Sequence, residues 1–144
     1  MAADQIIARL RSIFDAFTTR GDASHLLECL TEETVYQISI GPGTPVANEY
    51  VGKEAITEYF RGLPANVQHI SLNIHDYFAN DQKGVVTGDE TLRIVKDGTV
   101  FYTQWATIFT FDGDKITHVM VVENLGALSQ AYGVPHAGPP SIAA

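Results

Sequence analysis

Two Asp-Gly dipeptides in the second half of the chain, Asp97-Gly98 and Asp112-Gly113, constrain the fold more than any other feature. Each lies between two runs that are rich in β-branched and aromatic residues, and Asp-Gly in that setting is a strong signal for a tight β-hairpin turn. A looser turn around Asn80 separates a further pair of such runs. The sequence therefore predicts a four-stranded antiparallel meander with long strands, at residues 67–78, 84–95, 100–111 and 115–123.

The first half of the chain follows a helical pattern. Apolar residues recur there every three or four positions in three segments, which predicts three amphipathic helices. Gly21 and Pro64 follow the first and the third segment and are typical helix ends. An alternating stretch between the second and third segments predicts a short strand. The predicted helices cover residues 4–20, 22–30 and 53–63, and the predicted strand covers residues 34–40.

This order of elements predicts an α+β domain, in which three N-terminal helices pack on a curved, mostly antiparallel sheet. A strongly bent sheet that helices close off forms a cone, and the inside of a cone is a natural small-molecule pocket. At 144 residues the chain is long enough for one such domain, which we place at residues 1–128. Residues 129–144 are rich in Gly and Pro and are expected to form a tail.

The charge content limits the partners of this domain. Only 18% of the residues are charged, against roughly 25% in an average soluble domain. This shortfall predicts an enclosed apolar cavity, a surface covered by another subunit, or both. The net charge of −8 disfavours nucleic acid and anionic membrane surfaces, and no apolar run is long enough to cross a bilayer. Charged residues interrupt the apolar N-terminus, which argues against a signal peptide and predicts a cytoplasmic protein.

Five short segments together match the pattern of a known superfamily: residues 20–22, 34–36, 52–56, 109–116 and 123–128. On these segments the chain resembles the NTF2-like superfamily, in particular its SnoaL-like branch, which includes ketosteroid isomerases, limonene-epoxide hydrolases and polyketide cyclases. The resemblance implies the cone fold and a small organic substrate. It does not imply one reaction, because members of this superfamily run different chemistries, and some none, from the same cone.

The residues that carry catalysis in two of these relatives are only partly present. The three positions that match the tyrosine and the two acids of the isomerases hold Phe14, Gln37 or Ile38, and Thr107, so the isomerase machinery is not expected here.

The hydrolases are closer, since their first strand resembles Tyr36-Gln37. Their two acids fall on Glu90 and Asn124, and the Arg between those acids falls on Gly88. One acid is therefore kept and the Arg is lost.

Glu90 is the strongest candidate for acid-base chemistry. Residues two apart on a strand share a face, so if Thr107 faces the cone, Glu90 on the neighbouring strand does too, between apolar side chains. Burial raises the pKa of a carboxyl group toward neutrality, and such a group can take or give a proton. In the alternative interpretation Glu90 faces outward and pairs with Arg93 or Lys115.

Asn124 and Tyr36 are the other candidate catalytic residues. A buried Asn124 would orient a water or polarise a carbonyl group, whereas an exposed one would cap the strand end. Glu123 alternates to the opposite face, so a shift of one residue in register would exchange the two roles. Tyr36 is either a hydrogen-bond donor in the pocket or a core aromatic. The predicted substrate-binding residues are Phe14, Phe17, Phe60, Trp105, Thr107 and Met120.

Neither a metal nor another cofactor is expected. His69 and His75 share a strand face but lie six residues apart, about 20 Å at ~3.3 Å per residue, too far to hold one ion. Gly41-Pro42-Gly43 lacks the context of a phosphate-binding loop. Cys29, the single cysteine, is expected to be a buried structural thiol.

We therefore expect a small enzyme that performs cofactor-free acid-base chemistry (an isomerase, cyclase, dehydratase or hydrolase) on a mostly apolar, oxygenated molecule. The alternative is a non-catalytic ligand-binding or dimerisation module. An inward-facing Glu90 beside an enclosed cavity would favour the enzyme, and a cone filled by side chains would favour the module. A homodimer is expected through the outer sheet face, which carries Tyr102, Gln104, Ala106 and Ile108.

Overall fold

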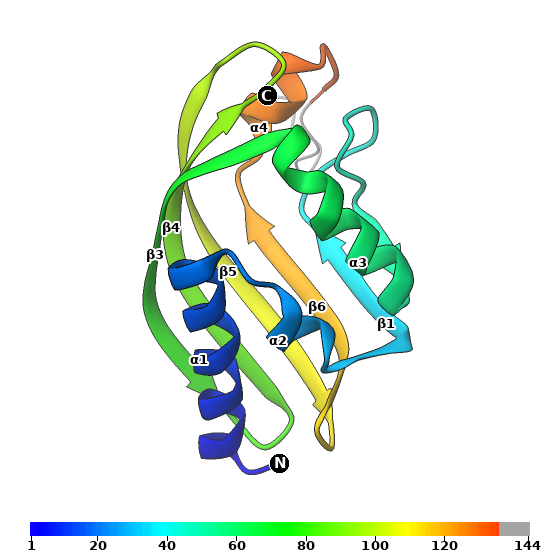
Figure 1. Ribbon diagram of the computed structural model, residues 1–144, viewed down its shortest axis with the longest axis vertical. Coiled ribbons are helices and arrows are strands. Elements are labelled where there is room, and N and C mark those ends of the chain that lie inside the picture. The colour runs from blue at the N-terminus through cyan, green and yellow to red at the C-terminus, as the bar shows by residue number, and fades with distance from the viewer. Residues whose placement is uncertain (136–144) are drawn as a thin grey trace, which may run out of the picture.

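The computed structural model describes residues 1–135 as a six-stranded sheet with helices on one face (Figure 1). The strand order is β2-β1-β6-β5-β4-β3, and every neighbouring pair is antiparallel except β1 and β6. The predicted α+β architecture and the predicted meander are confirmed. The helices are α1 (Ala3–Arg20), α2 (Ser24–Leu27), α3 (Lys53–Gly62) and α4 (Gly126–Ala131), with a 3-10 turn, η1 (Leu63–Ala65). The strands are β1 (Leu30–Ile38), β2 (Glu49–Val51), β3 (Val67–Ala79), β4 (Lys83–Ile94), β5 (Val100–Asp112) and β6 (Lys115–Glu123).

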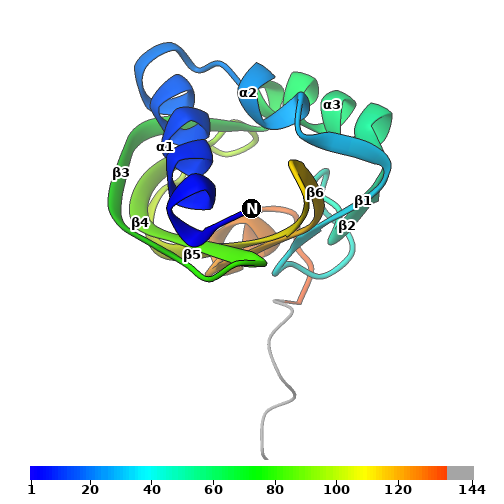
Figure 2. The same cartoon turned by 90° about the horizontal axis from the view of Figure 1, so that it is seen from below.

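Helix α1 covers the concave face of β3 and β4 (Figure 2). Its apolar residues recur at helical spacing, and Ile6, Leu10 and Ile13 are fully buried against the sheet. The helix ends at Gly21, whose backbone adopts the left-handed conformation and whose N–H donates to the carbonyl oxygen of Phe17. Helices α2 and α3 close the remaining side of the concave face. The sheet and the three helices thus form the expected cone.

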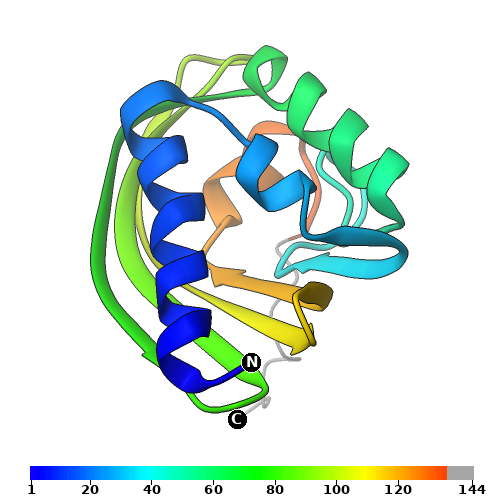
Figure 3. The same ribbon diagram turned by 60° about the horizontal axis from the view of Figure 1, so that its bottom comes forward.

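Two bulges bend the edge strand β3. Its ladder with β4 skips Ile70 and His75, so each of these residues has no partner across the strand pair. An extra residue in one strand increases the local bend and twist. The sheet consequently curls around α1 (Figure 3). This curvature creates the hollow that the candidate site occupies.

The ends of some elements differ from the sequence-based expectation. Leu30 begins β1, where it pairs with Ile116, instead of ending the second helix. The short strand β2 was not predicted. Helix α4 crosses residue 128, the expected end of the domain, and the last part of the expected tail, residues 136–144, lies outside the described residues. No helix in residues 1–135 is both long and apolar enough to span a membrane.

Candidate active site

A cavity of about 450 Å³ lies between the concave face of the sheet and the helices. This volume lies within the range of about 300–1,000 Å³ that is typical of small-molecule sites. Its walls are mostly apolar, with several aromatic rings, and its polar groups are few. The lining includes five of the six predicted substrate-binding residues: Phe14, Phe17, Phe60, Trp105 and Thr107.

The aromatic rings of the wall hold one another in place. The ring of Phe14 on α1 stacks on Trp105 of β5, with ring centres 5.6 Å apart and planes 11° from parallel. Phe17, one turn further along α1, meets Phe60 of α3 at 5.9 Å. Because such pairs restrict ring rotation, the helices and the sheet form a pre-shaped apolar pocket. The indole Nε1 of Trp105 is buried with no hydrogen-bond partner in residues 1–135, which leaves one donor unused beside the cavity.

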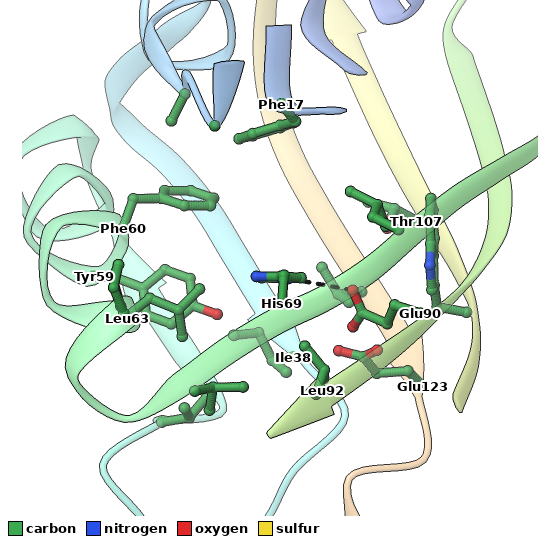
Figure 4. A pocket seen from close by; sticks show the side chains of 18 of the residues that line it. Phe17, Ile38, Tyr59, Phe60, Leu63, His69, Glu90, Leu92, Thr107 and Glu123 are labelled. Carbon is green, nitrogen blue, oxygen red and sulfur yellow. Dashed lines mark ion pairs between the residues drawn. The ribbon is translucent and has the colours of Figure 1, made fainter. Parts of the chain in front are cut away.

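Two carboxyl groups, those of Glu90 on β4 and Glu123 on β6, lie together in this apolar pocket (Figure 4). Both strands flank β5, where Glu90 is paired with Thr103 and Glu123 with Trp105. Residues directly opposite one another in an antiparallel pair share a face, so the two side chains converge over the concave side of β5. Figure 4 shows the carboxyl groups facing one another, with Leu92 beside them.

The surroundings of Glu123 keep its carboxyl group protonated at neutral pH. Burial, followed by the hydrogen bond and the charge of the adjoining Glu90 carboxyl, raises the pKa of Glu123 to about 9. No fixed donor in the described residues reaches the buried Glu123 Oε2. A hydrogen bond between the two groups therefore requires a proton between them. Since two adjacent carboxyl groups do not both ionise readily, the proton that Glu123 retains can lie between the two groups.

The backbone around Glu123 is fixed from both sides. The Glu123 N–H donates to Ser39 Oγ at 2.8 Å, and the Ser39 hydroxyl donates to the Glu123 carbonyl oxygen at 2.8 Å. The next residue, Asn124, donates its N–H to Thr103 Oγ1 at 3.1 Å. These bonds tie the end of β6 to its neighbours, which limits the movement of the Glu123 carboxyl.

Asn124 and Met120 require a correction, because both side chains are exposed and neither lines the cavity. The cause is a bulge in β6. Thr110 pairs with His118 and Phe111 with Ile116, so Thr117 is skipped and every later residue changes face. The position that points into the pocket is therefore that of Glu123. Asn124 instead accepts a hydrogen bond from the Gly126 N–H at 3.0 Å, in a turn that leads into α4.

Two tyrosines complete the polar part of the site. Tyr36 on β1 is buried, lines the cavity and packs on Tyr59 of α3, with ring centres 5.7 Å apart. Burial, followed by the charges of Glu123 and Glu90, raises the pKa of Tyr36. Burial also raises the pKa of Tyr59 well above its ordinary value. Both hydroxyl groups thus stay protonated and are able to donate hydrogen bonds. Tyr59 was not among the site residues predicted from the sequence.

His69 also lines the cavity, although the sequence pattern raised it only as a possible metal ligand. Its Nε2 lies 3.3 Å from Glu90 Oε2, which places an ionisable ring beside the acid pair. Within residues 1–135, no group of three or more His, Cys, Asp or Glu side chains is placed to hold a metal ion. Cys29 is free and buried, with its Sγ 3.2 Å from the Arg9 guanidinium.

Gly88, the position that matches the hydrolase Arg, has no room for a side chain. A Cβ atom there would collide with the Asn73 carbonyl oxygen and with the Trp105 indole. Next to Asn124, the position that matches the second hydrolase acid, Glu123 lines the cavity. The site thus contains two acids without the Arg between them.

The fold and the pocket define the class of protein. A bent sheet closed by N-terminal helices around an apolar pocket is the architecture of the NTF2-like proteins. A comparison with known families matches residues 10–119 to the SnoaL-like domain. The chain belongs to the SnoaL-like domain family, as its sequence motifs predicted. A search of curated proteins found no match.

Solved structures support the same fold assignment. An NTF2-like protein from Burkholderia xenovorans LB400 superposes with a TM-score of 0.76 at 23% identity, over 92% of this chain and 99% of that one. TerC, co-crystallised with polyporic acid, superposes with a TM-score of 0.70 at 15% identity, over 88% of this chain and 96% of that one. The third structure is a protein from Catenulispora acidiphila with a ketosteroid isomerase-like fold, in complex with trimethylamine. It superposes with a TM-score of 0.65 at 17% identity, over 90% of this chain and 95% of that one. At these identities the likeness concerns the fold alone.

Proposed function

We propose that this protein is an enzyme that binds a small, mostly apolar, oxygenated molecule in the cavity and moves a proton on it by cofactor-free acid-base chemistry. The observation that carries the proposal is the Glu90–Glu123 pair, two carboxyl groups that lie together inside an apolar pocket that raises the pKa of Glu123. A cone filled by aromatic side chains would have favoured a binding module, whereas the cavity of about 450 Å³ beside an inward-facing Glu90 favours the enzyme.

The two carboxyl groups have complementary roles in this proposal. The protonated Glu123 donates a hydrogen bond to a substrate oxygen, such as that of a ketone, and withdraws electrons from the neighbouring carbon atom. The Glu90 carboxylate takes a proton from the carbon atom that adjoins the carbonyl carbon. The electrons of the broken C–H bond form a C=C bond, and the proton of Glu123 passes to the oxygen, which gives an enol. The enol is then protonated at another carbon or attacks a second carbonyl group, which are the routes of an isomerase and of a cyclase.

Tyr36 and the aromatic wall support this step. The Tyr36 hydroxyl stays protonated, so it can donate a second hydrogen bond to the substrate oxygen. Since the lining contains no Lys or Arg, the pocket favours uncharged molecules over carboxylates. TerC, a protein with this fold, is co-crystallised with polyporic acid, which supports a small organic molecule as the ligand.

Deuterium incorporation tests the proposal and does not require the product to be identified. Steroid ketones, terpenoid ketones and aromatic polyketones are incubated with the protein in D₂O. Mass spectrometry follows the replacement by deuterium of the hydrogens on the carbon next to the carbonyl group. We expect at least one compound class to exchange. Glu90→Gln removes the proposed general base and Glu123→Gln removes the proposed general acid. Each variant should slow the exchange about 10²- to 10⁴-fold. Glu33→Gln, a change at an exposed glutamate, is the matched control. Full activity in Glu90→Gln would refute the assignment.

We also propose that a second copy of the chain covers the outer face of the sheet. A continuous apolar row crosses this face, because Phe78 pairs with Val85, Val85 with Ile108, and Ile108 with Met120. Phe78 is 58% exposed and Tyr102 is 59% exposed, and α1, α2 and α3 lie on the opposite face. Apolar surface of this kind is typical of an interface. In a homodimer with two-fold symmetry, the apolar row of one subunit would pack against the same row of the other subunit.

A further inference from the structure

The buried carboxyl group of Glu90 is connected to solvent through one side chain. His69 Nε2 lies 3.3 Å from Glu90 Oε2, as the dashed line in Figure 4 marks. The side chain of His69 is 46% exposed, whereas that of Glu90 is 9% exposed. Among the described residues that line the cavity, His69 is the one histidine, and Lys and Arg are absent. An imidazole ring, whose nitrogen atoms can accept and donate protons, thus lies between the inner acid and the outside water.

The bulge at Ile70 explains this placement. Across the β3–β4 ladder, His69 pairs with Leu92 and Leu72 pairs with Glu90, while Ile70 is skipped. Leu92 and Glu90 both face the cavity, so their partners His69 and Leu72 face it too, although three positions separate them. Without the bulge, simple alternation would turn one of these two residues away from the cavity. The irregularity therefore keeps His69 beside the acid at the edge of the sheet.

The other ionisable groups around Glu90 offer no comparable route to solvent. Glu123 on β6 is protonated and its Oε2 is buried. Burial raises the pKa of Tyr36 on β1 and of Tyr59 on α3, so these hydroxyl groups keep their protons at neutral pH. Within residues 1–135, His69 is therefore the half-exposed member of the set that faces Glu90.

We propose that His69 is a proton relay, which carries protons between solvent and Glu90. In each cycle the Glu90 carboxyl passes its proton to Nε2 of the neutral imidazole, which restores the carboxylate and forms an imidazolium ion. The imidazolium ion then gives a proton to water or to a buffer base and returns to its neutral form. The role of this relay in turnover rests on the proposed function. The relay implies that the proton taken from the substrate is exchanged through His69 for a solvent proton, so the proton added to the product comes from solvent rather than from the same molecule.

The test uses the protein without a substrate, through the C=O stretching band of its protonated carboxyl group. After rapid mixing into D₂O, infrared spectroscopy follows the shift of this band as the carboxyl proton exchanges. Loss of the band in Glu123→Gln assigns it to the acid pair. Because a positioned acid-base group contributes about 10²-fold or more to a proton transfer, we expect His69→Ala to slow the exchange by about that factor, and added imidazole to restore part of the rate.

Two further variants separate a relay from a structural role. His69→Gln keeps a polar side chain but cannot titrate, so it should also exchange slowly. His75→Ala is the matched control, because His75 lies on the same strand and contacts a carboxylate, Asp89 Oδ2, at 2.6 Å, but does not line the cavity. Its exchange rate should equal that of the wild type. Exchange as fast as the wild type in folded His69→Gln or His69→Ala would overturn the relay.

The outcomes for the relay and for the proposed function remain distinct. If no ketone exchanges hydrogen with the wild type but the carboxyl exchange depends on His69, the proposed function fails and the proton path remains. In the opposite case, Glu90→Gln abolishes turnover, but the His69 variants change neither the rate of carboxyl exchange nor the amount of substrate hydrogen kept in the product. The relay proposal then fails and the proposed function remains.

Discussion

At the scale of single residues, the position of Glu123 decides the chemistry of the site. An isolated inward Glu90 would be a buried base without a partner. With Glu123 opposite, the pocket holds an acid and a base of the same chemical type, whose different surroundings separate their roles. Tyr36 and Trp105 add hydrogen-bond donors, and His69 adds a contact with solvent.

The raised pKa of Glu123 predicts how stability depends on pH. The folded state keeps this proton up to about pH 9, whereas the unfolded chain loses it near pH 4.5. The folded state thus binds more protons between these values, and the free energy of unfolding falls as pH rises through this window, by at most about 1.4 kcal/mol per pH unit.

Thermal unfolding checks this prediction. Between pH 5 and 9, the Tm of the wild type should fall more steeply than the Tm of Glu123→Gln, which has no carboxyl group to ionise. At pH 8 the variant should be the more stable protein. Glu33→Gln, at an exposed position, should follow the wild type. Parallel Tm curves for the wild type and Glu123→Gln would show that Glu123 titrates normally.

At the scale of elements, close contact between strands β3 and β4 and the Trp105 ring fixes the back wall of the pocket. A Cβ at Gly88 would collide with the Asn73 carbonyl oxygen and the indole ring, and neither can move freely. We expect Gly88→Ala to lower the free energy of unfolding by about 1–3 kcal/mol. Gly62→Ala is the control, since nothing lies within 4 Å of a Cβ there. Denaturant unfolding measures both, and equal stability of the two variants would contradict this packing.

Elements also show what the sequence could and could not predict. Turn chemistry and periodicity were sufficient for α1, α3 and the meander, because these signals are local. The face of β6 was not predictable, because it depends on a bulge at Thr117 in the ladder with β5 and on pairing with β1, which lies far away in sequence. Simple alternation from the buried Ile116 places Asn124 inward, and the bulge replaces it with Glu123. For the same reason the His69–Glu90 contact, which depends on the bulge at Ile70, was missed.

At the scale of the whole molecule, the low charge content has two structural correlates. The inner face of the sheet and the helices enclose an aromatic cavity, and the outer face presents an apolar row. In our proposals a ligand occupies the cavity, and a second copy of the chain covers the apolar row.

Sedimentation tests the dimer. The wild type should sediment as a dimer at micromolar concentration, because an apolar sheet face supplies the association energy. Ile108→Glu, in the centre of the row, should give a folded monomer, since it would bury an unpaired charge at the interface. Ala8→Glu, on the exposed side of α1, should remain a dimer. A monomeric wild type would contradict the proposal.

The proposed chemistry depends on one proton shared by Glu90 and Glu123. Carbon-detected NMR of protein labelled with ¹³C at the glutamate carboxyl groups measures this directly across a pH titration. We predict one carboxyl resonance that titrates near pH 9 and disappears in Glu123→Gln. If every glutamate carboxyl is ionised by pH 6, the pair holds no proton at neutral pH, and the proposed acid-base mechanism is wrong.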